Sequence, residues 1–277
     1  MGFKGFLSLI YTTSIFVIAM SLPTSPSSTT PHAALRLWIL LTLACWLGLL
    51  GLSAQAAGLE VSPIGLVLAS DEAAGSFTFS NVEARPIHAQ ARIFRWTQDE
   101  KGEEVLSPTQ DILVSPPILA IDPRGSQEIR LIRQQTGGSE ELQYRLIVDE
   151  IPEPAAPVAK QQIRLVLRYS IPIFLNAIER PVPTLQWHAQ SMGKDSTLFT
   201  IKNTGKVRAQ IAQTWLQSGS EAQAKTVASL SDGLWAYVLP GKTIQRSSPI
   251  PYAKLGAAGV TLISTINGQE TPVSLEK

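Results

Sequence analysis

Hydrophobic and polar residues alternate with a period of two along most of the chain after residue 58. The clearest case is the stretch 144–174, in which two alternating segments, 144–152 and 161–174, flank a Pro- and Ala-rich spacer at 153–160. Period-two alternation is typical of β-strands with one buried face. The stretch therefore predicts two strands joined by a flexible loop.

The second of these strands is unusually long and has two different faces. Its apolar face comprises Ile163, Leu165, Leu167, Tyr169, Ile171 and Ile173. Gln162, Arg164, Arg168 and Ser170 lie mostly on the opposite face. Strands of about 5–6 residues are typical. A strand facing its own core is the ordinary interpretation, but the preceding spacer and the length favour an edge strand. Tyr169, Ile171 and Ile173 could belong to the core, whereas the earlier positions exceed what one small sandwich covers.

Further strand-like segments occur on both sides of this stretch. Those before it lie at 76–80, 87–96, 112–114 and 127–133. Those after it follow a Pro-rich linker, at 185–187, 197–201, 207–215, 236–239, 243–246 and 259–266. Turn residues recur at spacings near 8–12 residues, which is the pattern of β-sandwiches. We therefore predict an all-β protein with two immunoglobulin-like β-sandwich domains, residues 57–175 and 176–277.

The N-terminal part has the pattern of an export signal. An apolar run at 37–52 follows Arg36 and ends in an Ala-x-Ala sequence at Ala56. This is typical of a secretory signal peptide, and the run is shorter than the ~20 residues of a membrane-spanning helix. Residues 1–56 are thus predicted to be a signal peptide with an N-terminal extension, cleaved after Ala56 or alternatively Ala57. We expect no stable membrane insertion after cleavage.

A second apolar run precedes the signal and leaves the translation start open, with Met20 as one alternative. The single cysteine, Cys45, lies within the signal. The mature chain is therefore predicted to contain neither a disulfide nor a reactive thiol.

Charge and motif content exclude several classes of function. The formal net charge of the 277-residue chain is +1, so bulk charge gives no basis for nucleic-acid binding. His88 and His188 are the only histidines of the mature chain and have no acidic or cysteine neighbour at metal-ligand spacing. No nucleophile elbow, phosphate loop or zincin motif occurs. We predict a non-enzymatic protein without a metal or cofactor.

Several short segments, in this order and spacing, carry a resemblance to a known family. They are Ser115-Pro116-Pro117, Pro123-Arg124-Gly125-Ser126-Gln127-Glu128-Ile129-Arg130, Tyr144-Arg145-Leu146, Glu150-Ile151-Pro152, Arg168-Tyr169-Ser170-Ile171-Pro172-Ile173-Phe174, Leu185-Gln186-Trp187, Asn203-Thr204-Gly205 and Tyr237-Val238-Leu239-Pro240-Gly241. With them the chain resembles the periplasmic pilus-assembly chaperones of the PapD-like family. The Tyr-Arg-Leu and Tyr-Ser-Ile-Pro-Ile-Phe forms are more similar to the archaic branch, which is associated with spore-coat-U-type pilin subunits.

The resemblance implies two immunoglobulin-like domains set as a boomerang, with a subunit-binding cleft between them. It implies that Ile163, Leu165 and Leu167 are lent to an incomplete pilin sandwich, since chaperone–pilin pairs are an established case of β-strand addition. The implied partners are spore-coat-U-type pilins and an outer-membrane usher, and the implied location is the periplasm. A secreted two-domain immunoglobulin-like adhesin or ligand-binding module is the alternative function.

Basic residues near this strand are candidates for binding the terminal carboxylate of the subunit. In the family a late lysine of this strand and an arginine of the first strand do so, but the matching first-strand segment 61–66 has no basic residue. Arg164 and Arg168 are alternative counterparts of the lysine. Arg130, Arg133 and Arg145, on adjacent predicted strands, could supply a different basic cluster.

Glu150 is a candidate for the family's interdomain ion network. Arg168 is one candidate partner, and a solvated strand-end glutamate is the alternative interpretation. The aspartate that the family places in the second domain would fall near Asn267-Gly268, where this chain has no acid. The resemblance therefore implies at best a partial network.

Overall fold

The computed structural model describes residues 58–152, 166–178, 181–219 and 224–276. The regular secondary structure of these residues is strand, apart from a four-residue helix α2 (Tyr252–Leu255). The predicted all-β class is confirmed. The signal peptide, the spacer and the strand positions Ile163, Arg164 and Leu165 lie outside the described residues.

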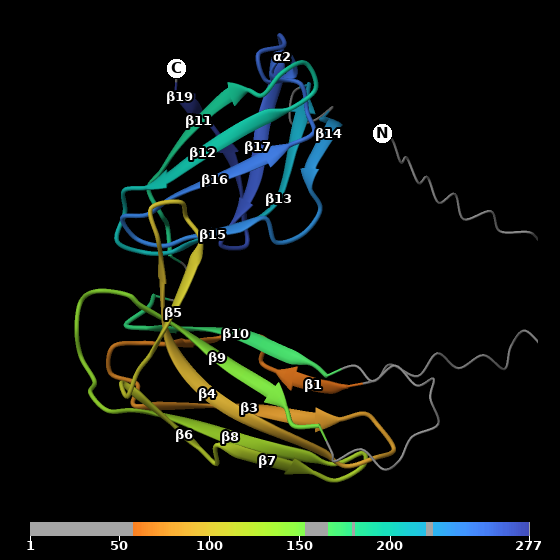
Figure 1. The fold of residues 1–277 in the computed structure, drawn as a ribbon. Helices are drawn as coiled ribbons and strands as arrows, with labels where there is room; N and C mark the ends of the chain where they lie inside the picture. The colour runs from red at the N-terminus through yellow and green to blue at the C-terminus, as the bar shows by residue number, and fades with distance from the viewer. Residues whose placement is uncertain (1–57, 153–165, 179–180, 220–223, 277) are drawn as a thin grey trace, which may run out of the picture. The chain divides into compact units, whose positions relative to one another are not determined.

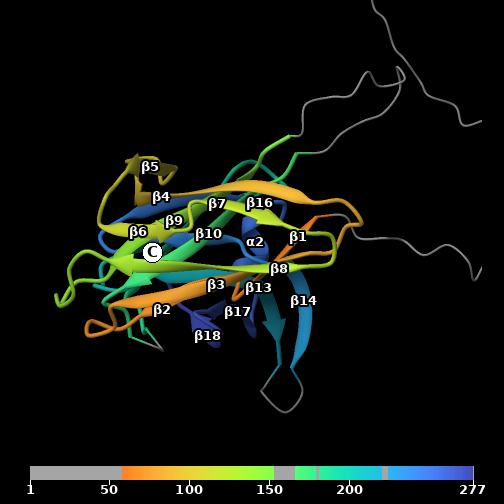
Figure 2. The same ribbon diagram turned by 90° about the horizontal axis from the view of Figure 1, so that it is seen from below.

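Strands before residue 176 form two sheets, here called the first sandwich (Figures 1 and 2). One sheet has the order β1 (Leu59–Ser62), β3 (Ala74–Asn81), β8 (Ser126–Arg133), β6 (Ile112–Ser115). The other has the order β2 (Leu66–Leu68), β10 (Arg168–Leu175), β9 (Leu142–Glu150), β4 (Ile87–Gln98), β5 (Glu104–Pro108), and β7 (Ile118–Ile121) also pairs with β4. We call the latter sheet the β10 sheet.

Later strands form two further sheets, the second sandwich. One has the order β16 (Thr243–Ser248), β12 (Thr197–Asn203), β11 (Leu185–Ser191), β19 (Leu275–Glu276). The other has the order β14 (Lys225–Ser231), β13 (Ala209–Ser218), β17 (Val260–Ile266), β18 (Gln269–Val273), and β15 (Ala236–Val238) pairs with β13. Two pairs of sheets are the arrangement that the spacing of turn residues predicts.

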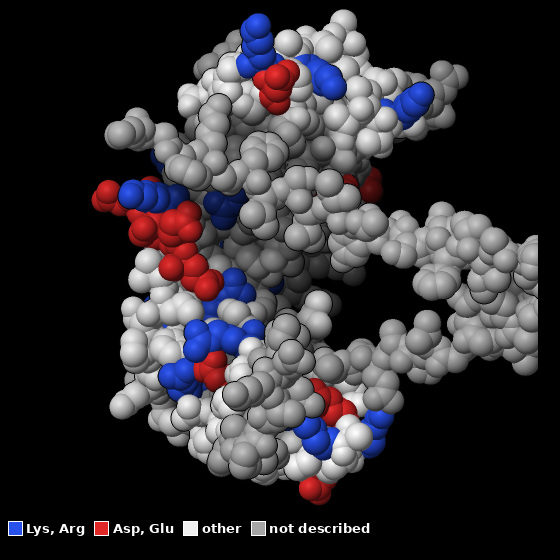
Figure 3. Space-filling view, turned by 45° about the vertical axis from the view of Figure 1, so that its right-hand side comes forward, with Lys and Arg blue, Asp and Glu red and all other residues white. Residues whose placement is uncertain are grey.

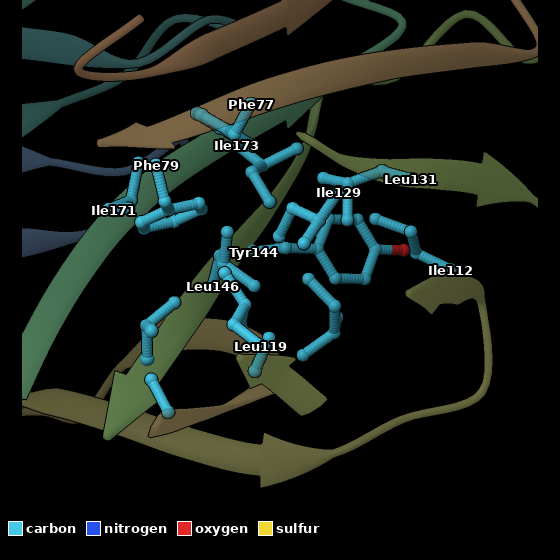
Figure 4. Packing of buried hydrophobic residues seen from close by; sticks show 14 of the residues in the cluster. Phe77, Phe79, Ile112, Leu119, Ile129, Leu131, Tyr144, Leu146, Ile171 and Ile173 are labelled. Carbon is cyan, nitrogen blue, oxygen red and sulfur yellow. The ribbon is translucent and has the colours of Figure 1, made fainter. Parts of the chain in front are cut away.

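The core of the first sandwich is built from the inward positions of both its sheets (Figure 4). Phe77 and Phe79 come from β3, and Ile171 and Ile173 come from β10; all four are buried. Tyr144 is fully buried, and its hydroxyl points toward Ile112 (Figure 4). The alternation of the long strand thus serves the strand's own core from Ile171 onward.

Strand β10 lies at the edge of its sheet for part of its length. It pairs with β9 in antiparallel register from Arg168↔Asp149 to Leu175↔Leu142. On its other side it pairs in parallel with β2, but only from Ile173↔Leu66 to Leu175↔Leu68. Within the described part of the chain, residues 168–172 of β10 therefore have no strand on that side. An unpaired strand edge is a template for pairing with another chain.

Candidate functional site

Leu167 is the described residue at the root of the predicted donor segment. It is half-buried, and its carbonyl accepts a hydrogen bond from the backbone N–H of Glu150 at 3.0 Å. Its own N–H donates to the Glu150 carboxylate at 3.4 Å. Pairing with the neighbouring strand thus continues to Leu167, and Pro152, which has no N–H, follows soon after Glu150 on that strand.

The upstream positions Ile163 and Leu165 lie outside the described residues. The described residues of the predicted apolar face are Leu167, Tyr169 and Ile171. Val166, which has the opposite phase, has 49% of its surface exposed. This exposure agrees with the predicted faces of the strand.

Tyr169 fastens the first strand to β10. Its hydroxyl accepts a hydrogen bond from the Leu59 N–H at 3.0 Å and donates one to the Leu59 carbonyl at 2.8 Å. Burial raises the pKa of the Tyr169 hydroxyl. Both backbone polar groups of Leu59 are thereby satisfied by a side chain of β10, immediately beside the predicted donor segment.

Arg168 is paired with an acid on the adjacent strand. It forms an ion pair with Asp149, which also binds Arg92 of β4. Burial disfavours the charged carboxyl of Asp149, but hydrogen bonds from Arg168 and Arg92 outweigh it and lower its pKa. Arg168 is therefore exposed but already has a carboxylate partner.

Arg145 occupies a different position on the same outer face of the β10 sheet. Arg145 pairs directly across from Pro172 of β10. Pro172 lies close to Gly65: a Cβ added to this glycine would be 3.3 Å from the proline ring. The guanidinium carbon of Arg145 is 3.8 Å from the centroid of the Trp96 ring, and the Arg145 Nε donates to Glu104 at 2.8 Å. Arg145 is therefore the charged residue beside Pro172 and Gly65, which carry no charge.

The other two predicted arginines lie on β8, in the opposite sheet. Arg130 is exposed, on the outward-facing phase of the strand. Arg133 is buried and binds the carbonyls of Ala69, Ser70 and Glu72. Neither lies in the same sheet as Arg145, so the structure does not bring the three into one cluster.

Comparison with known proteins identifies this arrangement. Residues 58–177 match the family model for the pili and flagellar-assembly chaperone, PapD N-terminal domain. Residues 58–177 therefore match the N-terminal domain of this chaperone family. This is a family of non-enzymatic periplasmic pilus-assembly chaperones. A search of curated proteins finds no match.

Solved structures share the fold over most of the chain. One is a chain of the CsuC–CsuE chaperone–tip adhesion subunit pre-assembly complex from archaic chaperone-usher Csu pili of Acinetobacter baumannii, with a TM-score of 0.56 and 21% identity over 79% of this chain and 98% of that one. Another is a chain of the SafA pilin–SafB chaperone complex of Salmonella enterica, with a TM-score of 0.50 and 14% identity over 80% and 99%. These similarities concern the fold.

A buried ion pair lies between the sandwiches at Glu141, and not at Glu150. The Glu141 carboxylate accepts hydrogen bonds from the Arg208 backbone N–H at 2.8 Å and from the Arg208 guanidinium at 2.6 Å. Glu150 instead binds Arg85 of the first sandwich at 3.1 Å, and the expected Glu150–Arg168 pair does not form. Glu141 directly precedes β9 and Glu150 is its last residue, so the two lie at opposite ends of the strand, and only Glu141 lies at the end that reaches the second sandwich.

Asn267 completes this junction without the acid that the family resemblance placed there. Its side-chain amide donates to the carbonyls of Pro181 and Arg208 and accepts from the Gln210 N–H. The guanidinium carbon of Arg208 lies 3.8 Å from the centroid of the Phe174 ring. Among the described residues the junction thus combines the Asn267 amide, the Glu141–Arg208 ion pair and the stacking of Arg208 on Phe174.

The β4–β5 hairpin of the PapD-like domain also reaches the second sandwich. Gln98 donates to the Tyr237 carbonyl at 2.8 Å and accepts from the Leu239 N–H at 2.9 Å. Gly102, with φ +78°, packs so closely that an added Cβ would lie 2.7 Å from the Cα of Ile244. Sequence alternation alone could not predict these contacts, because each partner lies more than 130 residues away in the chain.

Charge on the described surface is mixed. Basic and acidic side chains are interspersed on the face seen in Figure 3, in line with the ion pairs of Arg92, Arg145 and Arg168. In the described parts of the chain the helix is α2, whose four residues are far too few to span a bilayer. The same ranges hold no group of three or more His, Cys, Asp or Glu residues that could hold a metal ion.

Proposed function

We propose that this protein is a periplasmic chaperone that folds and caps pilin subunits by donor-strand complementation and delivers them to an outer-membrane usher. The proposal rests on the edge of β10 opposite β9. Over residues 168–172 this edge has no neighbouring strand among the described residues. The match of residues 58–177 to the chaperone family model supports the proposal. The export signal predicted at 1–56 accounts for the periplasmic location.

The donor segment is the part of the strand that precedes the core positions. Ile171 and Ile173 are buried in the first sandwich, whereas Ile163, Leu165 and Leu167 precede the closure formed by Tyr169 and Leu59. A pilin sandwich that lacks one strand exposes backbone groups and an apolar groove. The donor segment supplies hydrogen bonds along that edge, and its alternate side chains fill the groove.

The proposed subunits are spore-coat-U-type pilins. The Tyr144-Arg145-Leu146 and 169–174 sequences support the archaic branch, and the fold shared with a chain of the Csu complex agrees with it. No enzymatic step or cofactor is needed, because the free energy of pilin folding drives the process. The usher is the partner expected to accept the subunit.

Arg145 is the arginine best placed to bind the terminal carboxylate of the subunit. It lies on the outer face of the β10 sheet, directly opposite Pro172. Stacking on Trp96 holds the guanidinium in place, and Glu104 uses its Nε, so other N–H groups remain for a carboxylate. Arg168 is a weaker choice because its side chain is 67% exposed, against 13% for Arg145, so water screens its charge more strongly.

Co-expression with the pilin encoded next to this protein tests the proposal. Wild-type protein should keep the pilin soluble and co-purify with it, and Leu165→Glu should abolish both, because a charge cannot enter an apolar groove. Val166→Glu is the matched control: it adds the same charge one residue away on the exposed face and should retain the pilin. A pilin that remains stable without this protein, or equal behaviour of the two variants, would refute donor-strand complementation.

A further inference from the structure

A polar cavity opens at one end of the first sandwich, apart from the outer face of the β10 sheet. It has a volume of about 710 Å³ and is lined from both sheets. Arg95 and Tyr144 contribute from the β10 sheet, and Arg133 contributes from β8. The apolar part of the cavity wall is formed by Leu113, Leu142 and Leu175. The cavity is therefore large enough for a small molecule or the end of a peptide, and it combines two cations with an apolar surface.

Arg133 provides a buried positive charge without a described acidic partner. The residue has 6% of its surface exposed. Its guanidinium donates to three backbone carbonyls and to the Asn176 side-chain oxygen at 2.6 Å, and its Nε–H has no partner within the described chain. These acceptors are neutral dipoles. A buried cation is normally paired with an anion, because its desolvation is costly.

Arg95 brings a second guanidinium that is partly available. It lies 3.1 Å from Asp111 and 3.4 Å from the Tyr144 hydroxyl, and 45% of its side chain is exposed. The Tyr144 hydroxyl donates to Asp111 at 2.8 Å, and this hydrogen bond is the main cause of the lowered pKa of the Asp111 carboxyl. Asp111 thus balances one of the two arginines, and the cavity keeps one net positive charge from these three side chains.

We infer that this cavity binds a small oxyanion, a carboxylate or a phosphate, through Arg95 in the field of Arg133. Guanidinium groups match both anions in charge and in hydrogen-bond geometry. Gln110, Gln134 and Thr136 line the same cavity and offer further donors. The site is distinct from the strand edge of β10 and from Arg145, so it does not depend on pilin binding.

Binding to the purified mature chain, without pilin, tests the site. Isothermal titration calorimetry at constant ionic strength should detect binding of phosphate or succinate, added as sodium salts, with sodium chloride as the reference. Arg95→Gln should weaken binding about 10-fold, and Asp111→Asn should strengthen it about 10-fold, because it removes the competing negative charge. A gain of affinity cannot arise from misfolding, so the second variant protects the test from that ambiguity.

The source of the anion is distinguished by a further arm. A short peptide with a free C-terminal carboxylate is compared with its C-terminal amide, next to inorganic phosphate. Arg130→Gln, which removes an exposed arginine of the same sandwich, is the matched control and should leave the affinity unchanged. Failure of phosphate, succinate and the free peptide to bind above chloride overturns the inference. Binding that does not respond in opposite directions to Arg95→Gln and Asp111→Asn overturns it too.

Discussion

Tyr169 and Leu59 join the two strands nearest the predicted donor segment through a double hydrogen bond. The tyrosine hydroxyl binds the Leu59 N–H at 3.0 Å and the Leu59 carbonyl at 2.8 Å. Leu59 has 7% of its surface exposed, so water cannot readily replace these bonds. The Tyr169 side chain thus makes the hydrogen bonds to Leu59 that a neighbouring strand would otherwise make at the start of β1.

Tyr169→Phe should destabilise the protein because it leaves both polar groups of Leu59 without this partner while keeping the ring. We expect a loss of about 1–3 kcal/mol in the free energy of unfolding, measured by urea denaturation. Tyr252→Phe, which changes a tyrosine with 46% exposure, is the control and should be close to neutral. Equal stability of the two variants would contradict the role of the double hydrogen bond.

Glu141→Gln should be strongly destabilising. The Glu141 and Arg208 side chains are 1% and 9% exposed, and the substitution leaves Arg208 as a buried unpaired cation. Removing one partner of a buried pair costs about 3–5 kcal/mol. Thermal unfolding checks this, with Glu276→Gln in the exposed His188 pair as the control. A shift in melting temperature no larger than that of the control would show that the junction tolerates an unpaired arginine.

We expect Asp149 to make a small, pH-dependent contribution to the free energy of unfolding. Because its folded pKa is lowered, this carboxylate stabilises the fold above the unfolded value of about 3.9, and the stabilisation disappears as the pH falls through the folded pKa. Asp149→Asn should cost up to about 1 kcal/mol at neutral pH, as is usual for surface ion pairs. Urea denaturation at pH 7 and near pH 2 should show this difference vanish in acid. A difference that grows in acid would have the wrong sign.

Gly102→Ala tests the close approach of the β4–β5 hairpin to the second sandwich. A methyl group there would lie 2.7 Å from the Ile244 Cα and 2.8 Å from the Thr243 carbonyl oxygen. Gly193→Ala is matched, since its φ of +92° imposes the same backbone strain but nothing lies within 4 Å. The Gly102 variant should lose more stability than its control in thermal unfolding by about 1–3 kcal/mol, the cost of overpacking.

Arg145→Met tests which of two arginines near the exposed edge of β10, Arg145 or Arg168, binds the terminal carboxylate of the subunit. The methionine keeps an apolar stem over Trp96 but loses the charge. If Arg145 binds the subunit carboxylate, pilin affinity should fall about 10- to 100-fold, the range for hydrogen bonds to charged groups. Arg168→Met should have a smaller effect because the Arg168 side chain is largely exposed and water screens its charge. Co-purification with pilin measures both, and the reverse order would assign the anchor to Arg168.

Strand β14 (Lys225–Ser231) shows where alternation stops being informative. The pattern predicted most long strands because one face of each is buried. In β14, Val227 is 46% exposed, and the sequence did not predict the strand. An edge strand with little buried surface leaves little trace in the order of polar and apolar residues.

The all-β class and the two-sandwich organisation could be predicted from the sequence, because burial of one sheet face imposes a period of two. Alternation leaves open whether Ile171 and Ile173 serve this core or a partner, and their burial in the folded chain assigns them to the core. Which charges meet depends on the folded arrangement. It paired Glu141 with Arg208 and Arg168 with Asp149, and it set Arg145 opposite Pro172. These partners depend on strand register and on contacts between residues distant in the chain. A pattern of local alternation contains no information about either.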